Sequence, residues 1–138
     1  MSHVLLSPEL MSKPLDNPEL VGPAIRAFAA VASAWCLTDS ERTSILEQPM
    51  HVLLTVLPKE DQGDLRAQTM ERVSYVLGIY RALHTIFPDQ EQADGWLRRP
   101  NASALIKGRP ALVLMCSGRL EDLASVRAHL DALGLDES

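Results

Sequence analysis

The residues of this chain that could do chemistry are few and scattered. Its four histidines are His3, His51, His84 and His129, and they have no metal-ligand spacing to one another or to carboxylates. The sequence contains no phosphate-binding glycine loop, no HExxH and no Gly-x-Ser-x-Gly motif. His84 lies on an apolar helical stripe, which favours a hydrogen-bonded core histidine over a catalytic base. We therefore predict a protein that is not an enzyme and that needs no metal or other cofactor.

The two cysteines do not change this view. Cys36 and Cys116 lie inside apolar helical patterns, with no CxxC motif or Cys/His cluster nearby. This pattern predicts buried, reduced thiols and favours a cytoplasmic setting. The chain has no run of eighteen apolar residues, and no basic N-terminal region precedes an apolar core. We therefore expect neither a membrane span nor a signal peptide.

A long helix must position whatever site the chain has. Residues 70–87 carry apolar side chains at steps of three and four, the spacing of one helix face. Further apolar residues lie off that stripe, so the helix must be covered from more than one side. We interpret residues 65–87 as a central helix that connects a helical lobe, residues 18–64, to a C-terminal domain, residues 88–138. Residues 1–17 read as a flexible arm, and the predicted fold class is all-α.

Local signals place the shorter helices. In the N-terminal lobe, helices are expected at about 18–35, 39–47 and 50–57, and the second begins with the capping-box pattern of Thr38 to Glu41. A polar loop over residues 59–64 then leads into the central helix. After Phe87, Asp89 can cap a short helix through Trp96, and a helix at 110–115 follows. Leucines from Leu120 onward mark an amphipathic last helix, which Gly134 is predicted to close.

The N-terminal helices are short and closely joined, as in helix-turn-helix units that bind DNA. The candidate recognition helix, residues 49–57, is almost wholly apolar, and the polar groups near its groove face are Gln48, His51, Thr55 and Lys59. The lobe is also acidic: residues 1–64 hold four basic and nine acidic residues, whereas residues 65–138 hold nine of each. Such a lobe should repel DNA. The alternative to a recognition helix is that residues 49–57 form a helix buried in the core or in a dimer contact.

Residues 71–133 resemble the toxin-binding region of the MbcA/ParS/Xre antitoxin family. The most specific stretches are Gly95-Trp96-Leu97, Pro100-Asn101 and Gly108-Arg109-Pro110-Ala111-Leu112. Residues 34–41 are similar to the Xre-like N-terminal domain of that family, in which glycine is usual at the place of Cys36. Members of the family are cytoplasmic dimers. The resemblance implies an antitoxin that caps a RES-type toxin, an enzyme that consumes NAD, and that often represses its own operon.

The resemblance also implies where the toxin would bind. Trp96 and Asn101 form the framework of the toxin-binding domain, with the indole beneath a loop and Asn101 capping its turn. The residues expected on or beside the toxin-facing helix are Arg109, Leu112, Met115 and Arg119. Each has an alternative: Trp96 is expected in the core whatever the function, Leu112 is equally a candidate for the core, and Arg98-Arg99 can be read as a solvated corner. The C-terminal end, with Leu133, Gly134 and Leu135, is where family members reach toward the toxin's active site.

A basic cluster within this half would complement an acidic, nucleotide-handling cleft on the toxin. Its members are Arg98, Arg99, Lys107, Arg109 and Arg119. We therefore predict a dimeric antitoxin that occludes its partner, with operator binding that is weak, absent or supplied by a different surface. The alternative is an Xre-type transcriptional regulator whose first partner is operator DNA.

Overall fold

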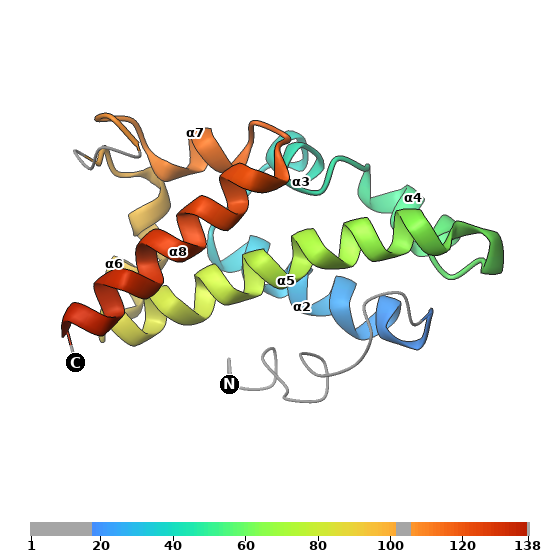
Figure 1. The fold of residues 1–138 in the computed structure, drawn as a ribbon, viewed down its shortest axis with the longest axis horizontal. Helices are drawn as coiled ribbons and strands as arrows, with labels where there is room; N and C mark the ends of the chain where they lie inside the picture. The colour runs from blue at the N-terminus through green and yellow to red at the C-terminus, as the bar shows by residue number, and fades with distance from the viewer. Residues whose placement is uncertain (1–17, 102–105, 138) are drawn as a thin grey trace.

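Helices form every regular element in the part of the chain that the structure describes, as the all-α prediction requires (Figure 1). The structure is a computed structural model, and it describes residues 18–101 and 106–137, with side chains up to residue 134. The predicted arm, residues 1–17, lies outside the described residues. Where the structure describes the chain, no strand is present, and the only β-type pairing is an isolated bridge between Pro100 and Pro110.

The first long helix ends in a turn that explains the left-handed backbone conformation of Cys36. After a 3-10 turn, η2 (Pro18–Leu20), α2 (Val21–Ala34) runs to Trp35. Leu37 N donates to Ala32 O at 2.9 Å and Cys36 N donates to Ser33 O at 3.0 Å, which is the Schellman pattern of a helix end. This pattern needs a left-handed residue, and Cys36 supplies it with φ of 56°. Its thiol is exposed, so the prediction of a buried cysteine was wrong at this position.

The next two helices follow the predicted signals closely. The capping box is present at the start of α3 (Asp39–Leu46), where Glu41 N donates to Thr38 Oγ1 at 3.1 Å and Thr38 N donates to Glu41 Oε1 at 2.9 Å. Glu47, with φ of 64°, turns the chain into α4 (Met50–Val56). The end of α4 is held by the buried side chain of Arg66, which donates to Leu57 O at 2.7 Å and to Lys59 O at 2.8 Å.

The central helix is α5 (Gly63–Ile86), preceded by the 3-10 turn η3 (Glu60–Gln62), so the helix begins within the predicted loop. The helices α2 and α8 pack on it, and Figure 1 shows α8 running beside α5 and approaching it toward the C-terminal ends of both helices. Ile79 lies off the predicted stripe but is fully buried, as expected for a helix that has neighbours on more than one side. The prediction that this helix is covered from more than one side is confirmed.

The C-terminal elements are short until the last one. Asp89 caps α6 (Gln90–Gly95), which continues into the 3-10 turn η4 (Trp96–Arg98). After the loop come α7 (Ala111–Met115) and α8 (Leu120–Glu137). The helix α8 continues through Gly134, so the prediction that this glycine ends the helix was wrong. A helix interior tolerates a glycine at a cost of only about 1 kcal/mol, and Gly134 faces Ile86 of α5 without crowding.

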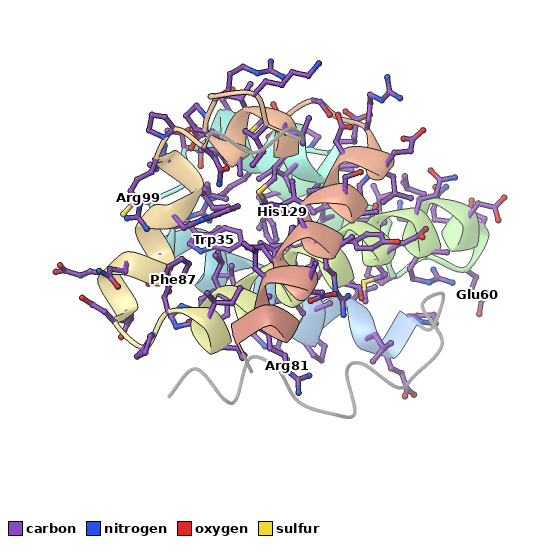
Figure 2. The ribbon with its side chains drawn as sticks, turned by 60° about the vertical axis from the view of Figure 1, so that its left-hand side comes forward. Trp35, Glu60, Arg81, Phe87, Arg99 and His129 are labelled. Atoms are coloured by element: carbon purple, nitrogen blue, oxygen red, sulfur yellow. The ribbon has the colours of Figure 1, made fainter. Side chains whose placement is uncertain are left out.

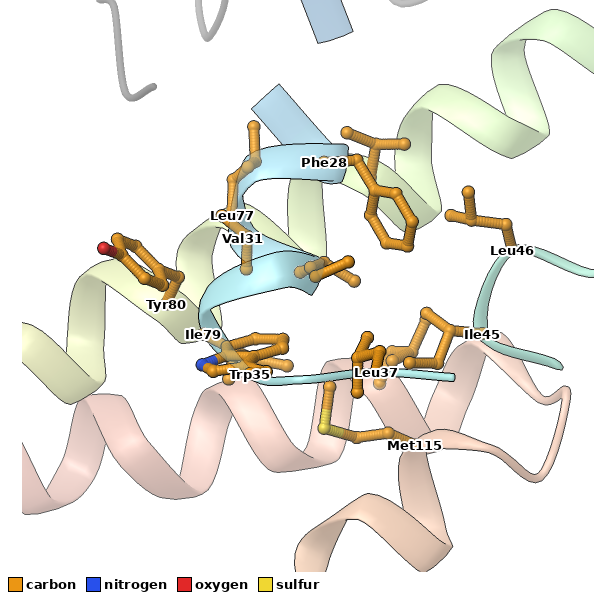
Figure 3. Close-up of a cluster of buried hydrophobic side chains, with 14 of the residues drawn as sticks. Phe28, Val31, Trp35, Leu37, Ile45, Leu46, Leu77, Ile79, Tyr80 and Met115 are labelled. Atoms are coloured by element: carbon orange, nitrogen blue, oxygen red, sulfur yellow. The ribbon is translucent and has the colours of Figure 1, made fainter. Parts of the chain in front are cut away.

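One hydrophobic cluster joins the N-terminal helices, α5 and the C-terminal helices. Figure 3 shows its centre, where Phe28 and Val31 of α2 lie near Leu77 and Ile79 of α5. Met115, at the end of α7, reaches the same cluster and is fully buried. The C-terminal helices therefore share their core with the N-terminal helices.

Candidate functional site

Arg98, at the end of η4, ties the C-terminal region to the N-terminal helices. Its Nη2 donates to Cys36 O at 2.8 Å, to Glu41 Oε1 at 3.0 Å and to Trp35 O at 3.3 Å. Its Nη1 donates to Glu41 Oε2 at 3.3 Å. The two carbonyls belong to the C-terminal end of α2, where the helix dipole favours a cation. We call this set of contacts the Arg98 clasp.

The clasp also sets the charge of Glu41. The hydrogen bond from Arg98 lowers the pKa of this carboxyl, and the hydrogen bonds with Thr38 act in the same direction, whereas partial burial acts against them. Glu41 is therefore ionised at neutral pH and forms an ion pair with Arg98. Since the same carboxylate belongs to the capping box, the position of Arg98 is linked to the start of α3.

A groove of about 410 Å³ lies beside the clasp, between α3 and α7. We call it the α3–α7 groove. It is lined by Ser40, Glu41, Ser44, Arg98, Pro110, Leu112, Val113 and Cys116. Burial raises the pKa of the Cys116 thiol, so that this wall is uncharged at neutral pH. Val113 is 47% exposed, and in residues 18–101 and 106–134 Leu54 is the other large hydrophobic side chain that is exposed.

A second groove, of about 610 Å³, lies on the other side of Arg98, between the end of α2 and α6. Two of its three acidic residues already serve the fold: Asp89 caps α6, and Asp94 Oδ1 lies 2.8 Å from His84 Nε2. The His84 ring also packs on Tyr80, with ring centroids 4.2 Å apart. His84 is thus the hydrogen-bonded residue that the sequence predicted. Trp35 also lines this groove, and its buried Nε1 has no acceptor among the described atoms.

Comparison with known proteins identifies the C-terminal region. The family described as "Antitoxin Xre/MbcA/ParS C-terminal toxin-binding domain" matches residues 82–134. Residues 82–134 therefore form a toxin-binding domain of this antitoxin family. The match begins inside α5 and ends inside α8, so it includes α6, η4, α7 and one wall of the α3–α7 groove.

A relative matches nearly the whole chain. This is "Uncharacterized protein y4oB" of Sinorhizobium fredii (strain NBRC 101917 / NGR234), which is 36% identical over 121 residues, 88% of this chain and 92% of the relative. No solved structure gives a significant match to the chain. No helix among the described residues is long and apolar enough to cross a membrane. Nor do these residues contain a group of three or more His, Cys, Asp or Glu side chains that could hold a metal ion.

Within the toxin-binding domain, two of the residues expected on or beside the toxin-facing helix point into the core. Leu112 and Met115 of α7 are both buried and belong to the core. Trp96 is buried as well, and its ring stacks on His129 of α8 with centroids 6.4 Å apart. These three residues shape the domain from within. The exposed apolar residue of α7 is Val113, which the sequence reasoning missed although it lies between two inward positions three residues apart.

The predicted basic cluster divides into two groups. Arg98 and Arg99 contact their own chain: Arg98 forms the clasp, and Arg99 Nη2 donates to Gln92 O at 2.7 Å. Figure 2 shows Arg99 at the edge of the molecule beside α6. The side chains of Lys107, Arg109 and Arg119 are exposed, and Arg119 lies 3.9 Å from Glu121.

The loop before α7 is closed at its base by Asn101. The backbone N of Asn101 donates to Arg109 O at 3.2 Å, and its carbonyl accepts from Gly108 N at 2.6 Å. Lys107 and Gly108 turn the chain with φ of 57° and 83°. At the other end of the domain, Leu133 and Gly134 are half-buried in α8, whereas the side chain of Leu135 lies outside the described residues.

The four residues considered for DNA binding surround α4. Gln48 is half-buried, and His51, Thr55 and Lys59 are exposed. The hydroxyl of Thr55 donates to His51 O at 3.2 Å and to Val52 O at 3.3 Å within its own helix. The most exposed apolar side chain of the helix is Leu54, at 59%. Sequence reasoning described this helix as apolar but did not single out Leu54.

Proposed function

We propose that this antitoxin neutralises a RES-type, NAD-consuming toxin by binding it and covering its active site, without catalysis of its own. The observation that carries the proposal is the match of residues 82–134 to a toxin-binding domain. The RES-type partner comes from the resemblance of the chain to antitoxins of that kind. Steric occlusion requires only that the antitoxin has a rigid surface that is complementary to the toxin. The toxin-binding domain shares its hydrophobic core with the N-terminal helices, which supports such rigidity.

The exposed residues of the domain indicate how the toxin would be held. Val113 offers an apolar contact beside the α3–α7 groove, and burial of apolar surface is the main favourable contribution in most protein–protein association. Lys107, Arg109 and Arg119 offer positive charge that suits an acidic rim around a nucleotide site. The half-buried residues at the end of α8, Leu133 and Gly134, would lie nearest to the occluded cleft.

We further propose that the antitoxin is a cytoplasmic homodimer that binds operator DNA weakly or not at all. The surface of α4 supports this view, because its exposed side chains include His51, Leu54 and Thr55 but no arginine or lysine. DNA binding depends on cations that neutralise phosphates. Salt-sensitive retention of an upstream operator fragment in a mobility-shift assay would overturn this part of the proposal.

The experiment for the main proposal is co-expression of the chain with the product of the neighbouring gene. The two proteins should co-purify, and cellular NAD should fall only when the antitoxin is left out. The variant Val113→Asp places a charge at the exposed apolar contact and should reduce co-purification. The matched control, Gln68→Asp, changes an exposed residue of α5 and should leave co-purification unchanged. If the proteins do not associate, or if NAD is lost equally with and without the antitoxin, the proposed function is wrong.

A further inference from the structure

The α3–α7 groove has walls from two parts of the chain. Pro110, Leu112, Val113 and Cys116 lie within residues 82–134, the segment that matches the toxin-binding domain. The opposite wall is formed by Ser40 and Ser44 of α3, about forty residues before that segment begins. Arg98 and Glu41 meet at the groove and join the two walls through their ion pair. A partner that touches Val113 therefore meets a surface that continues onto α3.

The α3 wall is held in place at both ends by arginines. At its start, Arg98 binds the Glu41 carboxylate, which the capping box also uses. At its end, Arg72 Nη1 of α5 donates to Ile45 O at 3.2 Å. The other nitrogen, Arg72 Nη2, donates to Gly118 O at 2.8 Å in the turn between α7 and α8. Because α3 is fixed relative to α7, the groove exists before a partner arrives, which reduces the entropy lost on binding.

The chemistry of the groove favours an uncharged occupant. Arg98 and Glu41 neutralise each other across 3.0 Å, and the thiol of Cys116 carries no charge at neutral pH. The remaining lining combines apolar side chains with the hydroxyls of Ser40 and Ser44. A volume of about 410 Å³ accommodates one or two side chains of a protein segment. A highly charged segment would lose its hydration here without gaining a partner of opposite sign.

We propose that the toxin-binding surface of this antitoxin extends beyond the matched domain onto α3, and that the α3–α7 groove receives an apolar side chain from an uncharged segment of the cognate toxin. The inference rests on the proposed function, since the toxin is the occupant. It is supported by the continuity of the groove with the toxin-binding domain and by the exposure of Val113 at its edge. The N-terminal helices then take part in toxin recognition, whatever they do with DNA.

The test introduces a bulky side chain into the α3 wall of the antitoxin. It then measures the affinity of the full chain for its cognate toxin. Ser44→Trp and Ser40→Trp fill the groove from α3 without a substitution in residues 82–134. Each should raise the Kd at least tenfold. The matched control is Ser33→Trp, the same substitution at an exposed helical serine that does not line the groove, and it should leave the Kd within twofold.

Two results would overturn the inference while the proposed function stands. One is a Kd within twofold of the parent for both groove variants while Val113→Asp weakens binding. The other is a loss of affinity in Ser33→Trp as large as in the groove variants. If the parent chain does not bind the toxin at all, the proposed function is wrong and the inference falls with it.

Hydrogen exchange on the unmodified complex gives a readout that does not depend on how the variants fold. Backbone amides in residues 39–46 should exchange more slowly when the toxin is bound, together with those of residues 110–116. Protection confined to residues 82–134 would contradict the inference, because α3 would then lie outside the interface.

Discussion

Arg98 shows how a residue predicted to contact the partner can also hold its own fold together. In the sequence it belongs to a basic cluster, and spacing alone does not reveal that its guanidinium reaches Trp35, Cys36 and Glu41 more than fifty residues earlier. Arg99 likewise contacts its own chain. The basic side chains that remain for a partner are those of the loop before α7 and the turn before α8.

Loss of the Arg98 clasp should destabilise the protein. Arg98→Met keeps much of the side chain's length but removes its hydrogen bonds, and we expect the free energy of unfolding to fall by about 1 kcal/mol. This is less than a buried hydrogen bond to a charged group contributes, because the Arg98 side chain is partly exposed. Urea unfolding measures the change, with Arg109→Met, also exposed, as the control. Equal losses in the two variants would show that the clasp contributes nothing.

The clasp should also make stability depend on pH. The pKa of Glu41 is lowered in the folded protein, so its contribution is present above the pKa of the unfolded chain and is lost as the pH falls through the folded value. The difference in Tm between the parent and Glu41→Gln should therefore be largest near neutral pH and shrink in acid. A difference that stays constant down to acidic pH would contradict this assignment.

Cys36 occupies a position where glycine fits better. Its φ of 56° costs a non-glycine residue about 1 kcal/mol, and its exposed side chain contributes little packing. Cys36→Gly should therefore raise the free energy of unfolding by about 0.5 to 1 kcal/mol. Cys36→Ala, which keeps the strained backbone and removes the thiol, should bring no gain. A loss of stability in Cys36→Gly would show that the thiol has packing or bonding that outweighs the strain.

At the scale of elements, the sequence predicted most helices and the caps that begin them. The helix caps at Thr38 to Glu41 and at Asp89 are made between residues that are close in the chain. Such caps can therefore be predicted from the local sequence. Periodicity did not decide between a core position and a toxin contact for Leu112, because a helix of five residues is too short for it to define the exposed side. Leu112 and Met115 point inward because they meet the core shared with distant helices, and this leaves Val113 outside.

The contact between α5 and α8 depends on a glycine. A Cβ added at Gly78 would lie 2.6 Å from the guanidinium of Arg127, which also approaches Asp131 at 3.6 Å. Gly78→Ala would otherwise stabilise a helix interior by about 1 kcal/mol. We therefore expect Gly78→Ala to be more favourable in an Arg127→Ala background than in the parent, by about 1 kcal/mol. Additive effects in this double-mutant cycle would mean that the two residues do not crowd each other.

At the scale of the molecule, one core runs through all three parts that the sequence suggested. The sequence predicted the central helix and its two neighbours, but it could not show that Met115 and Trp35 belong to one cluster, because this depends on contacts far apart in the chain (Figure 3). A shared core implies that the N-terminal and C-terminal helices lose their structure together. It also means that the toxin-binding surface is supported from beneath by α2 and α5.

Cooperative unfolding can be followed with the two tryptophans, one in each half of the chain. Trp96→Phe leaves Trp35 as the reporter of the N-terminal helices, and Trp35→Phe leaves Trp96 as the reporter of the C-terminal helices. In each variant the fluorescence midpoint in urea should coincide with the midpoint from far-UV circular dichroism. Separate midpoints within one variant would indicate two units that unfold independently.

The most direct test of the whole account is a titration of the purified cognate toxin, with NAD loss as the readout. Addition of the parent antitoxin should abolish NAD consumption at a fixed stoichiometric ratio, and Val113→Asp should need at least tenfold more protein for the same effect. Gln68→Asp should match the parent. If the parent leaves NAD consumption unchanged at saturating concentration, the chain does not act by covering the toxin's active site.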